Sequence, residues 1–190
     1  MSTLYPLLRP QIEAFVPGCG QERADRDQIL RQMELRGNLL TRDDPEMHFT
    51  ASSWIVSPDR QRVLLVWHER YRSWSWTGGH ADGEEDLLAV AMREASEETG
   101  VAEVRPVIPE IFSLEILGVA AHVRRGQYVS AHRHLNATYL LEADPALPLR
   151  PAPGETSAVA WFAMDEILSR STEAHMLPIY RKLIEKTRAL

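Results

Sequence analysis

The segment from Gly79 to Val101, GHADGEEDLLAVAMREASEETGV, constrains this chain more than any other stretch. Its second half lies in a run of good helix formers, which are Leu87, Leu88, Ala89, Ala91, Met92 and Ala95. This composition predicts a helix from about Glu85 to Thr99, and Gly100 is a suitable residue to end it. We expect Glu85 to enter the helix where its negative charge suits the helix dipole.

Three glutamates of this expected helix carry its chemistry. Glu94, Glu97 and Glu98 are separated by one, three or four positions, so their carboxylates are expected to lie close together on one face. Clustered carboxylates repel one another unless water or a cation neutralises them. Oxygen ligands favour Mg²⁺ or Mn²⁺ over zinc. The alternative is a glutamate-rich helix face that is merely solvated.

The spacing of the whole segment favours the metal site. It follows the pattern G-x5-E-x7-R-E-[apolar]-x-E-E-x-G-[apolar] without a mismatch. The positions are filled by Gly79, Glu85, Arg93, Glu94, Ala95, Glu97, Glu98, Gly100 and Val101. The segment closely resembles the signature of the Nudix hydrolases, and the flanking strand pattern extends this resemblance over residues 47 to 170.

The resemblance implies an α/β fold, an α/β/α sandwich with a mixed sheet. It also implies metal-dependent hydrolysis of a diphosphate bond in a nucleoside diphosphate linked to another moiety, with Mg²⁺ or Mn²⁺ as the cofactor. The implied metal ligands are Gly78, through its carbonyl, and Glu94, Glu97 and Glu98. Arg93 and Glu85 are implied to hold these carboxylates in position. Thr77 departs from the family, which usually has a proline at this place.

Further site residues are expected outside the signature. The general base is predicted to be one of the signature carboxylates or Glu155, because some Nudix hydrolases supply a carboxylate from the corresponding loop. Arg124 and Arg125 are candidates for binding the phosphate oxygens, although arginines at a turn are often just solvated. His132 and His134 share one strand face and are candidates for binding a metal or phosphate. The alternative for this pair is an exposed polar face.

The N-terminal part of the chain is expected to be a helical extension. Residues 1–20 predict an irregular arm or short helix, and residues 21–37 predict a helix with a narrow apolar stripe. We therefore divide the chain into an arm and helix over 1–45 and a hydrolase domain over 46–190. The helix is expected to pack on that domain, with a homodimer contact or a lid as alternatives.

The remaining pattern predicts strands followed by a terminal helix. Residues 48–57 and 62–68 are expected to form an antiparallel pair, and later strands are expected to be broken at Gly118 and at the turn of residues 124–126. A short strand at 158–162 should precede a helix that Asp165 caps.

Charge and composition argue against nucleic acids and membranes as partners. The formal net charge of −6 argues against broad nucleic-acid binding, so the expected partner is a small, nucleotide-derived diphosphate. No apolar run approaches the length of a membrane span, and no secretory signal is visible, which makes a cytoplasmic location the default expectation. The single Cys19 has no partner for an internal disulfide.

Two other functions were compared with hydrolysis. A Nudix-fold ligand sensor commonly lacks one of the signature glutamates, whereas this chain retains all of them. Isopentenyl-diphosphate isomerase shares the fold but relies on a cysteine near the position of Gly78 and Gly79. The overall pattern resembles bacterial Nudix proteins whose substrates are unassigned, so the substrate stays open.

Overall fold

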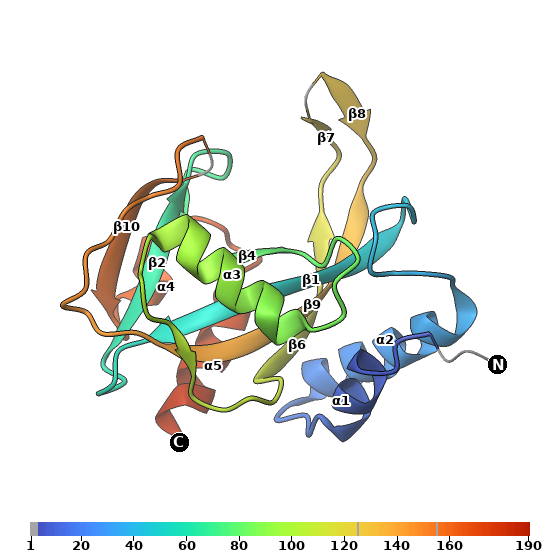
Figure 1. Cartoon of the computed structure of the whole chain (residues 1–190), viewed down its shortest axis with the longest axis horizontal. Helices are drawn as coiled ribbons and strands as arrows, with labels where there is room; N and C mark the ends of the chain where they lie inside the picture. Colours follow the sequence, from blue (N-terminus) through green and yellow to red (C-terminus); the bar gives the residue numbers. More distant parts are fainter. Residues whose placement is uncertain (1–3, 125, 155) are drawn as a thin grey trace.

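The computed structural model describes residues 4–124, 126–154 and 156–190. Helices and strands alternate irregularly along the chain (Figure 1). The helices are α1 (Leu8–Ala14), α2 (Gly20–Leu35), α3 (Leu87–Thr99), α4 (Ile167–Arg170) and α5 (Leu177–Arg188). The strands are β1 (Met47–Val56), β2 (Arg62–His68), β3 (Ser73–Ser75), β4 (Thr77–His80), β5 (Arg105–Pro106), β6 (Ser113–Val119), β7 (His122–Arg124), β8 (Gln127–Val129), β9 (His132–Glu142) and β10 (Thr156–Ala163).

The main sheet is mixed and has eight strands. Its central path runs β10-β2-β1-β9-β5, with β3 paired to β2, β4 paired to β1 and β6 paired to β9. The predicted antiparallel pair of β1 and β2 is present. Strands β7 and β8 form a separate hairpin that projects away from the body of the molecule (Figure 1).

Strand β1 lies at the centre of the sheet, and all ten of its residues are buried. It pairs with β9 in parallel along its whole length, from Met47 opposite Arg133 to Val56 opposite Glu142. Helices cover both faces of the sheet here, which explains why β1 mixes polar and apolar residues without an exposed face.

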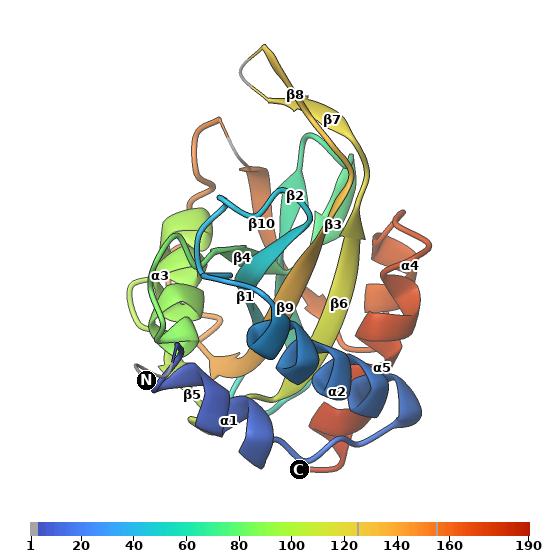
Figure 2. The same ribbon diagram turned by 90° about the vertical axis from the view of Figure 1, so that its right-hand side faces the viewer.

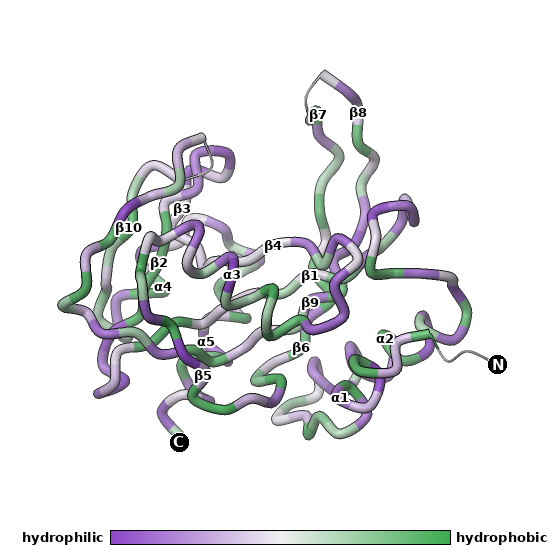
Figure 3. Tube along the Cα trace, viewed as in Figure 1, coloured by the Kyte–Doolittle hydropathy of each residue, from purple (hydrophilic) through white to green (hydrophobic). Residues whose placement is uncertain are grey.

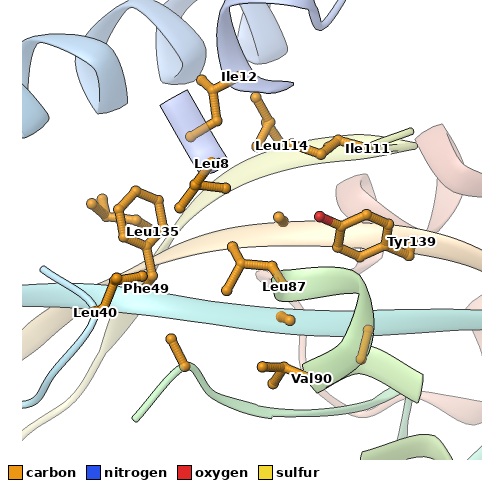
Figure 4. Packing of buried hydrophobic residues seen from close by; sticks show 14 of the residues in the cluster. Leu8, Ile12, Leu40, Phe49, Leu87, Val90, Ile111, Leu114, Leu135 and Tyr139 are labelled. Carbon is orange, nitrogen blue, oxygen red and sulfur yellow. The ribbon is translucent and has the colours of Figure 1, made fainter. Parts of the chain in front are cut away.

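Two helical layers enclose the sheet. Figure 2 shows α3 on one side and α4 with α5 on the other, so the predicted α/β/α sandwich is confirmed. Between α3 and the sheet, Leu87 and Val90 pack with Phe49 and Tyr139 (Figure 4). On the opposite face, Trp54 stacks on Tyr180 of α5 with ring centroids 5.8 Å apart.

The N-terminal helices extend the core on the α3 side. Leu8 and Ile12 of α1 and Ile29 and Met33 of α2 are buried and belong to the same apolar cluster as Phe49. The N-terminal segment therefore contributes to the core and is not a loose appendage. Among the described residues, no helix is both long enough and apolar enough to cross a membrane.

Helix α3 begins two residues later than the sequence indicates. Its N-cap is Asp86, whose side chain accepts a hydrogen bond from the Ala89 backbone N–H at 3.1 Å. The expectation that Glu85 enters the helix is therefore wrong. Gly100 ends the helix as predicted, in the left-handed conformation with φ of 67°. The first half of α3 is apolar and its second half is mostly polar (Figure 3).

Two other local predictions are wrong. Gly118 does not break a strand, because it lies inside β6 and pairs with Arg133. Asp165 does not cap the following helix, because α4 begins at Ile167 with Glu166 as its N-cap residue. At Gly118 a tertiary contact outweighs the local preference of the residue, because β9 pairs with β6 along its length.

Candidate active site

The signature carboxylates meet the sheet at β4. Glu98 is buried, with an exposed fraction of 3%, and its Oε1 accepts a hydrogen bond from the Gly78 backbone N–H at 2.8 Å. The Glu94 carboxylate lies directly over Gly79, where an added Cβ would stand 2.4 Å from its carboxyl carbon. The missing Cβ of Gly79 therefore allows Glu94 to approach the β4 backbone, whereas Glu98 is held there by the Gly78 N–H.

The third glutamate of the set points to solvent. The Glu97 side chain has an exposed fraction of 62% and lies 4.0 Å from Arg93 through its Oε1 and the arginine Nε. Arg93 also donates a hydrogen bond to Glu94 at 3.3 Å. Arg93 thus lies between Glu94 and Glu97, where it partly neutralises their charge.

Glu85 has a different neighbour from the one that the family resemblance implies. Its Oε1 accepts hydrogen bonds from the backbone N–H groups of Leu7 at 2.6 Å and Leu8 at 2.9 Å. These N–H groups lie at the start of α1, where they have no acceptor within the helix and its N-cap residue provides no side-chain cap. Glu85 therefore joins the signature loop to the N-terminal arm.

His68, at the end of β2, was not identified from the sequence. Its Nε2 lies 4.0 Å from Glu98 Oε2, so a protonated His68 would form an ion pair with this buried carboxylate. Only the pairing of β2 with β1 and of β1 with β4 brings His68 near α3, and no sequence motif signals this proximity.

Histidines from three strands gather beside the carboxylates. The structure confirms that alternate residues of β9 share a face, and His134 lies directly opposite His48 of β1. On the other side of β1, His80 of β4 lies opposite Thr50. The ring of His132 is 5.1 Å from that of His48, between centroids. The sequence interpretation included His132 and His134 but missed His48 and His80.

Burial keeps His48 and His134, the two inner histidines of this group, neutral. It lowers the pKa of His48 to about 4, and the charges of His132 and Arg42 act in the same direction. Burial likewise lowers the pKa of His134 to about 2, with a further contribution from His80. These rings are therefore poor candidates for binding phosphate as cations at neutral pH.

His132 also borders an open hollow of about 440 Å³ at the base of the projecting hairpin. The hollow is lined by Glu46, Gly118, Val119, Ala120, Ala131, His132 and Arg133. His132 thus connects the histidine group to a space accessible from solvent.

The predicted roles of Glu155, Arg124 and Arg125 are not tested by the structure. Glu155 and Arg125 are outside the described residues, and their assigned roles stay predictions. Arg124 ends β7 on the projecting hairpin, and its assigned role also stays a prediction.

Comparison with known proteins supports the fold and identifies a matching family model. The family model described as NUDIX domain matches residues 47–183. A curated relative from Streptomyces rubellomurinus, CMP-5'-(N-acetyl-N-hydroxy-3-aminopropyl)phosphonate hydrolase, is 41% identical over 63 residues. That match covers 29% of this chain and 31% of the relative, so it spans about a third of either protein.

Two solved structures share the fold at low sequence identity. The E. coli dihydroneopterin triphosphate pyrophosphohydrolase is 14% identical with a TM-score of 0.55, covering 72% of this chain and 94% of that chain. The C. elegans Ap4A hydrolase is 17% identical with a TM-score of 0.53, covering 75% of this chain and 98% of that chain.

Proposed function

The chain belongs to the NUDIX domain family, and we propose that it is a Nudix-type pyrophosphohydrolase that cleaves a nucleotide-derived diphosphate with Mg²⁺ or Mn²⁺ bound at the α3 carboxylates. The observation that carries the proposal is the approach of Glu94 and Glu98 to the backbone of Gly79 and Gly78. Two carboxylates beside a glycine backbone provide a hard, oxygen-rich donor set.

The residues present fit a divalent ion. The space that a Cβ of Gly79 would fill is instead occupied by the Glu94 carboxylate, which keeps that carboxylate against β4. Glu94, Glu97 and Glu98 would hold the ion, with the Gly78 carbonyl as a further donor. A bound divalent ion neutralises phosphate charge and lowers the pKa of water.

The other side chains position and balance these groups. The Gly78 N–H donates a hydrogen bond to one oxygen of Glu98 and so orients its carboxylate. Arg93 holds Glu94 and shields it from Glu97. Proton transfer from water falls to one of the three carboxylates or to Glu155, at an oxygen that does not bind the ion.

The nucleotide part of the substrate is inferred from the relatives. The Streptomyces relative is named for a CMP-linked phosphonate, and the C. elegans neighbour is named for Ap4A. Both names describe a nucleotide joined through phosphorus to a second group. We therefore propose a nucleoside 5'-diphosphate carrying another moiety as the substrate class, with the hollow beside His132 as the space for that moiety.

A substrate screen with matched variants tests the proposal. The protein is incubated with a panel of nucleotide-linked diphosphates and Mg²⁺ or Mn²⁺, and phosphate or nucleoside monophosphate release is measured. Glu98→Gln is expected to lower kcat by roughly 100-fold, because it removes a charge at the ion while keeping the size of the side chain. Glu97→Gln should also remove most activity.

Glu103→Gln is the control, since this exposed glutamate lies just beyond α3. It should turn over at the wild-type rate, and circular dichroism should show the same fold for all variants. Wild-type turnover by Glu98→Gln would contradict the assigned role of that carboxylate.

A further inference from the structure

Three histidines from neighbouring strands form a compact group, which we call the histidine cluster: His48 of β1, His80 of β4 and His134 of β9. One ring nitrogen from each lies within 4.8 Å of the others. The strand registers explain this, because β9 places His134 opposite His48, and β4 places His80 opposite Thr50, two residues along β1 on the same face.

The rings are spaced as three imidazoles around one ion would be. The centroid distances are 5.0 Å for His48 to His80, 5.0 Å for His48 to His134, and 4.9 Å for His80 to His134. With metal–nitrogen bonds of 2.0–2.1 Å and tetrahedral angles, ring centroids would stand about 5 Å apart. The planes are tilted by 36°, 50° and 82°, so the rings do not stack on one another.

The inner rings have polar atoms that no described residue satisfies. Both ring nitrogens of His48 and the Nε2 atom of His134 are buried and make no hydrogen bond. His48 has an exposed fraction of only 5%. A buried polar atom without a partner costs free energy, and a metal ion is one means of satisfying several imidazole nitrogens at once.

A fourth histidine stands beside this triangle. The His132 centroid is 5.1 Å from that of His48 and 5.2 Å from that of His134. Its Nδ1 lies 2.9 Å from the Ser130 carbonyl, which can only accept, so Nδ1 carries the proton. This arrangement leaves Nε2 with a free lone pair, and a ligating imidazole is commonly oriented by a carbonyl in this way.

We propose that the histidine cluster binds one borderline divalent transition-metal ion, with Zn²⁺ as the natural occupant and His132 next to the fourth coordination position. This site is separate from the α3 carboxylates. Its donors are nitrogens, which suit zinc, copper, nickel and cobalt, whereas the carboxylate oxygens suit Mg²⁺ and Mn²⁺. His80 follows Gly79 directly in β4, so the two metal sites would be neighbours along one strand.

Metal titration of the tag-free protein tests the proposal. Zn²⁺ is added to the chelator-treated chain in excess Mg²⁺, and binding is followed by calorimetry with a parallel Co²⁺ titration in visible absorption. We expect one Zn²⁺ per chain and the intense visible bands of tetrahedral Co²⁺. His134→Gln and His80→Gln should each weaken Zn²⁺ binding by about 100-fold or more, since even the loss of an outer partner of a ligand costs 10–100-fold.

Two further variants assign the binding to the right donors. The Glu94→Gln and Glu98→Gln double variant should bind Zn²⁺ as tightly as wild type, and so should His175→Gln, an exposed histidine at 66% outside the cluster. Zn²⁺ binding that disappears with the two glutamates and survives His80→Gln would overturn the proposal.

X-ray absorption of the Zn²⁺-loaded wild-type protein does not depend on how the variants fold. At least three imidazole scatterers are expected around the ion. Fewer than three, or no binding to the wild-type chain, would refute the site.

Discussion

At Gly78 and Gly79, the absence of a Cβ allows different contacts on adjacent residues. A Cβ on Gly79 would meet the Glu94 carboxylate, which is the mobile end of a side chain. A Cβ on Gly78 would meet the Ala51 carbonyl oxygen at 2.6 Å and the Ser52 Cα at 2.9 Å, which are backbone atoms of β1. Gly79 therefore leaves room for Glu94 at the site, whereas Gly78 leaves room for the β1 backbone within the sheet.

Alanine at these two positions should therefore give different defects. Gly79→Ala is expected to displace Glu94 and reduce kcat by at least about tenfold, with a raised requirement for Mg²⁺ and a nearly unchanged thermal midpoint. Gly78→Ala is expected to lower the thermal midpoint, because β1 and β4 must separate to admit the methyl group. Activity against Mg²⁺ concentration and thermal unfolding distinguish the two.

Gly37→Ala is the matched control, since a Cβ there meets no atom within 4 Å. It should change neither measurement. An active Gly79→Ala enzyme with ordinary Mg²⁺ dependence would show that the position of Glu94 over the glycine is not needed.

Among single residues, the sequence predicted the site residues that lie within one short motif. It missed the site residues that only strand pairing brings together. Glu94 and Glu98 lie four apart on a helix, so their proximity follows from the helical period. His48 and His80 are brought to His134 only by the registers of β4, β1 and β9, and no local period encodes such long-range pairings.

At the scale of elements, Glu85 connects the signature loop to the first turn of α1. The Leu7 and Leu8 N–H groups point at its carboxylate, and a negative charge is favourable at a helix N-terminus. Glu85 thus caps α1 from a position 77 residues further along the chain.

Glu85→Ala is expected to destabilise the protein by about 1 kcal/mol, the usual cost of losing an N-cap. Amide hydrogen exchange should rise first in α1, at Leu7 to Ile12. Glu13→Ala, which alters only an exposed ion pair with Arg9, should leave both measurements near wild type. Unchanged exchange in α1 of the Glu85 variant would mean that the helix is held by its apolar face alone.

Some elements depart from the sequence pattern for local reasons. Helix α3 starts after Asp86 because the Asp86 side chain caps it, while the Glu85 side chain binds the start of α1. The short strand β4 was not predicted, since TGGH has little strand preference and pairs with β1 through position alone. The β1–β2 pair was predicted well, because strand-type residues flank a short turn, and so was α5, which buries Tyr180, Leu183 and Ile184 on one face.

At the scale of the whole molecule, a buried ionic network ties α2 and α5 to the edge of the sheet. Glu22 is fully buried, and its Oε1 accepts hydrogen bonds from Lys186 at 2.9 Å and Ser113 at 2.7 Å. Lys182 lies 3.4 Å from Glu22 and donates to the buried Glu115 at 2.8 Å. Glu22 and Glu115 thus each have a lysine of α5 as a partner.

This network predicts a specific sensitivity to acid. Burial alone would raise the pKa of Glu22, but bonds from Lys186, Ser113 and the Gly18 N–H, with the Lys182 charge, hold it below the ordinary 4.5. A depressed carboxyl pKa stabilises the fold fully above the unfolded value, and this stabilisation is lost as pH falls through the folded value. We expect the free energy of unfolding of the wild type to fall below about pH 4.5.

Glu22→Gln should cost about 2–4 kcal/mol at pH 7, because it leaves lysines facing a neutral amide. It should also make the free energy of unfolding less steep in pH between pH 5 and 3 than in the wild type. Urea unfolding across this range measures both, with exposed Glu103→Gln as the control. Equal pH dependence in wild type and Glu22→Gln would exclude Glu22 as the source of acid lability.

The parallel pairing of β1 with β9 has a consequence for how the chain reaches this state. Thr50 and Asn136 are hydrogen-bonded across 86 positions of sequence, whereas β1 and β2 are joined by a short turn. Closing the longer loop costs entropy before any packing compensates it. The pairing of β1 with β9 is therefore expected to form later than the pairing of β1 with β2. During synthesis on the ribosome, β1 exposes one unpaired edge until β9 emerges, and this edge is where nascent chains would be most prone to aggregate.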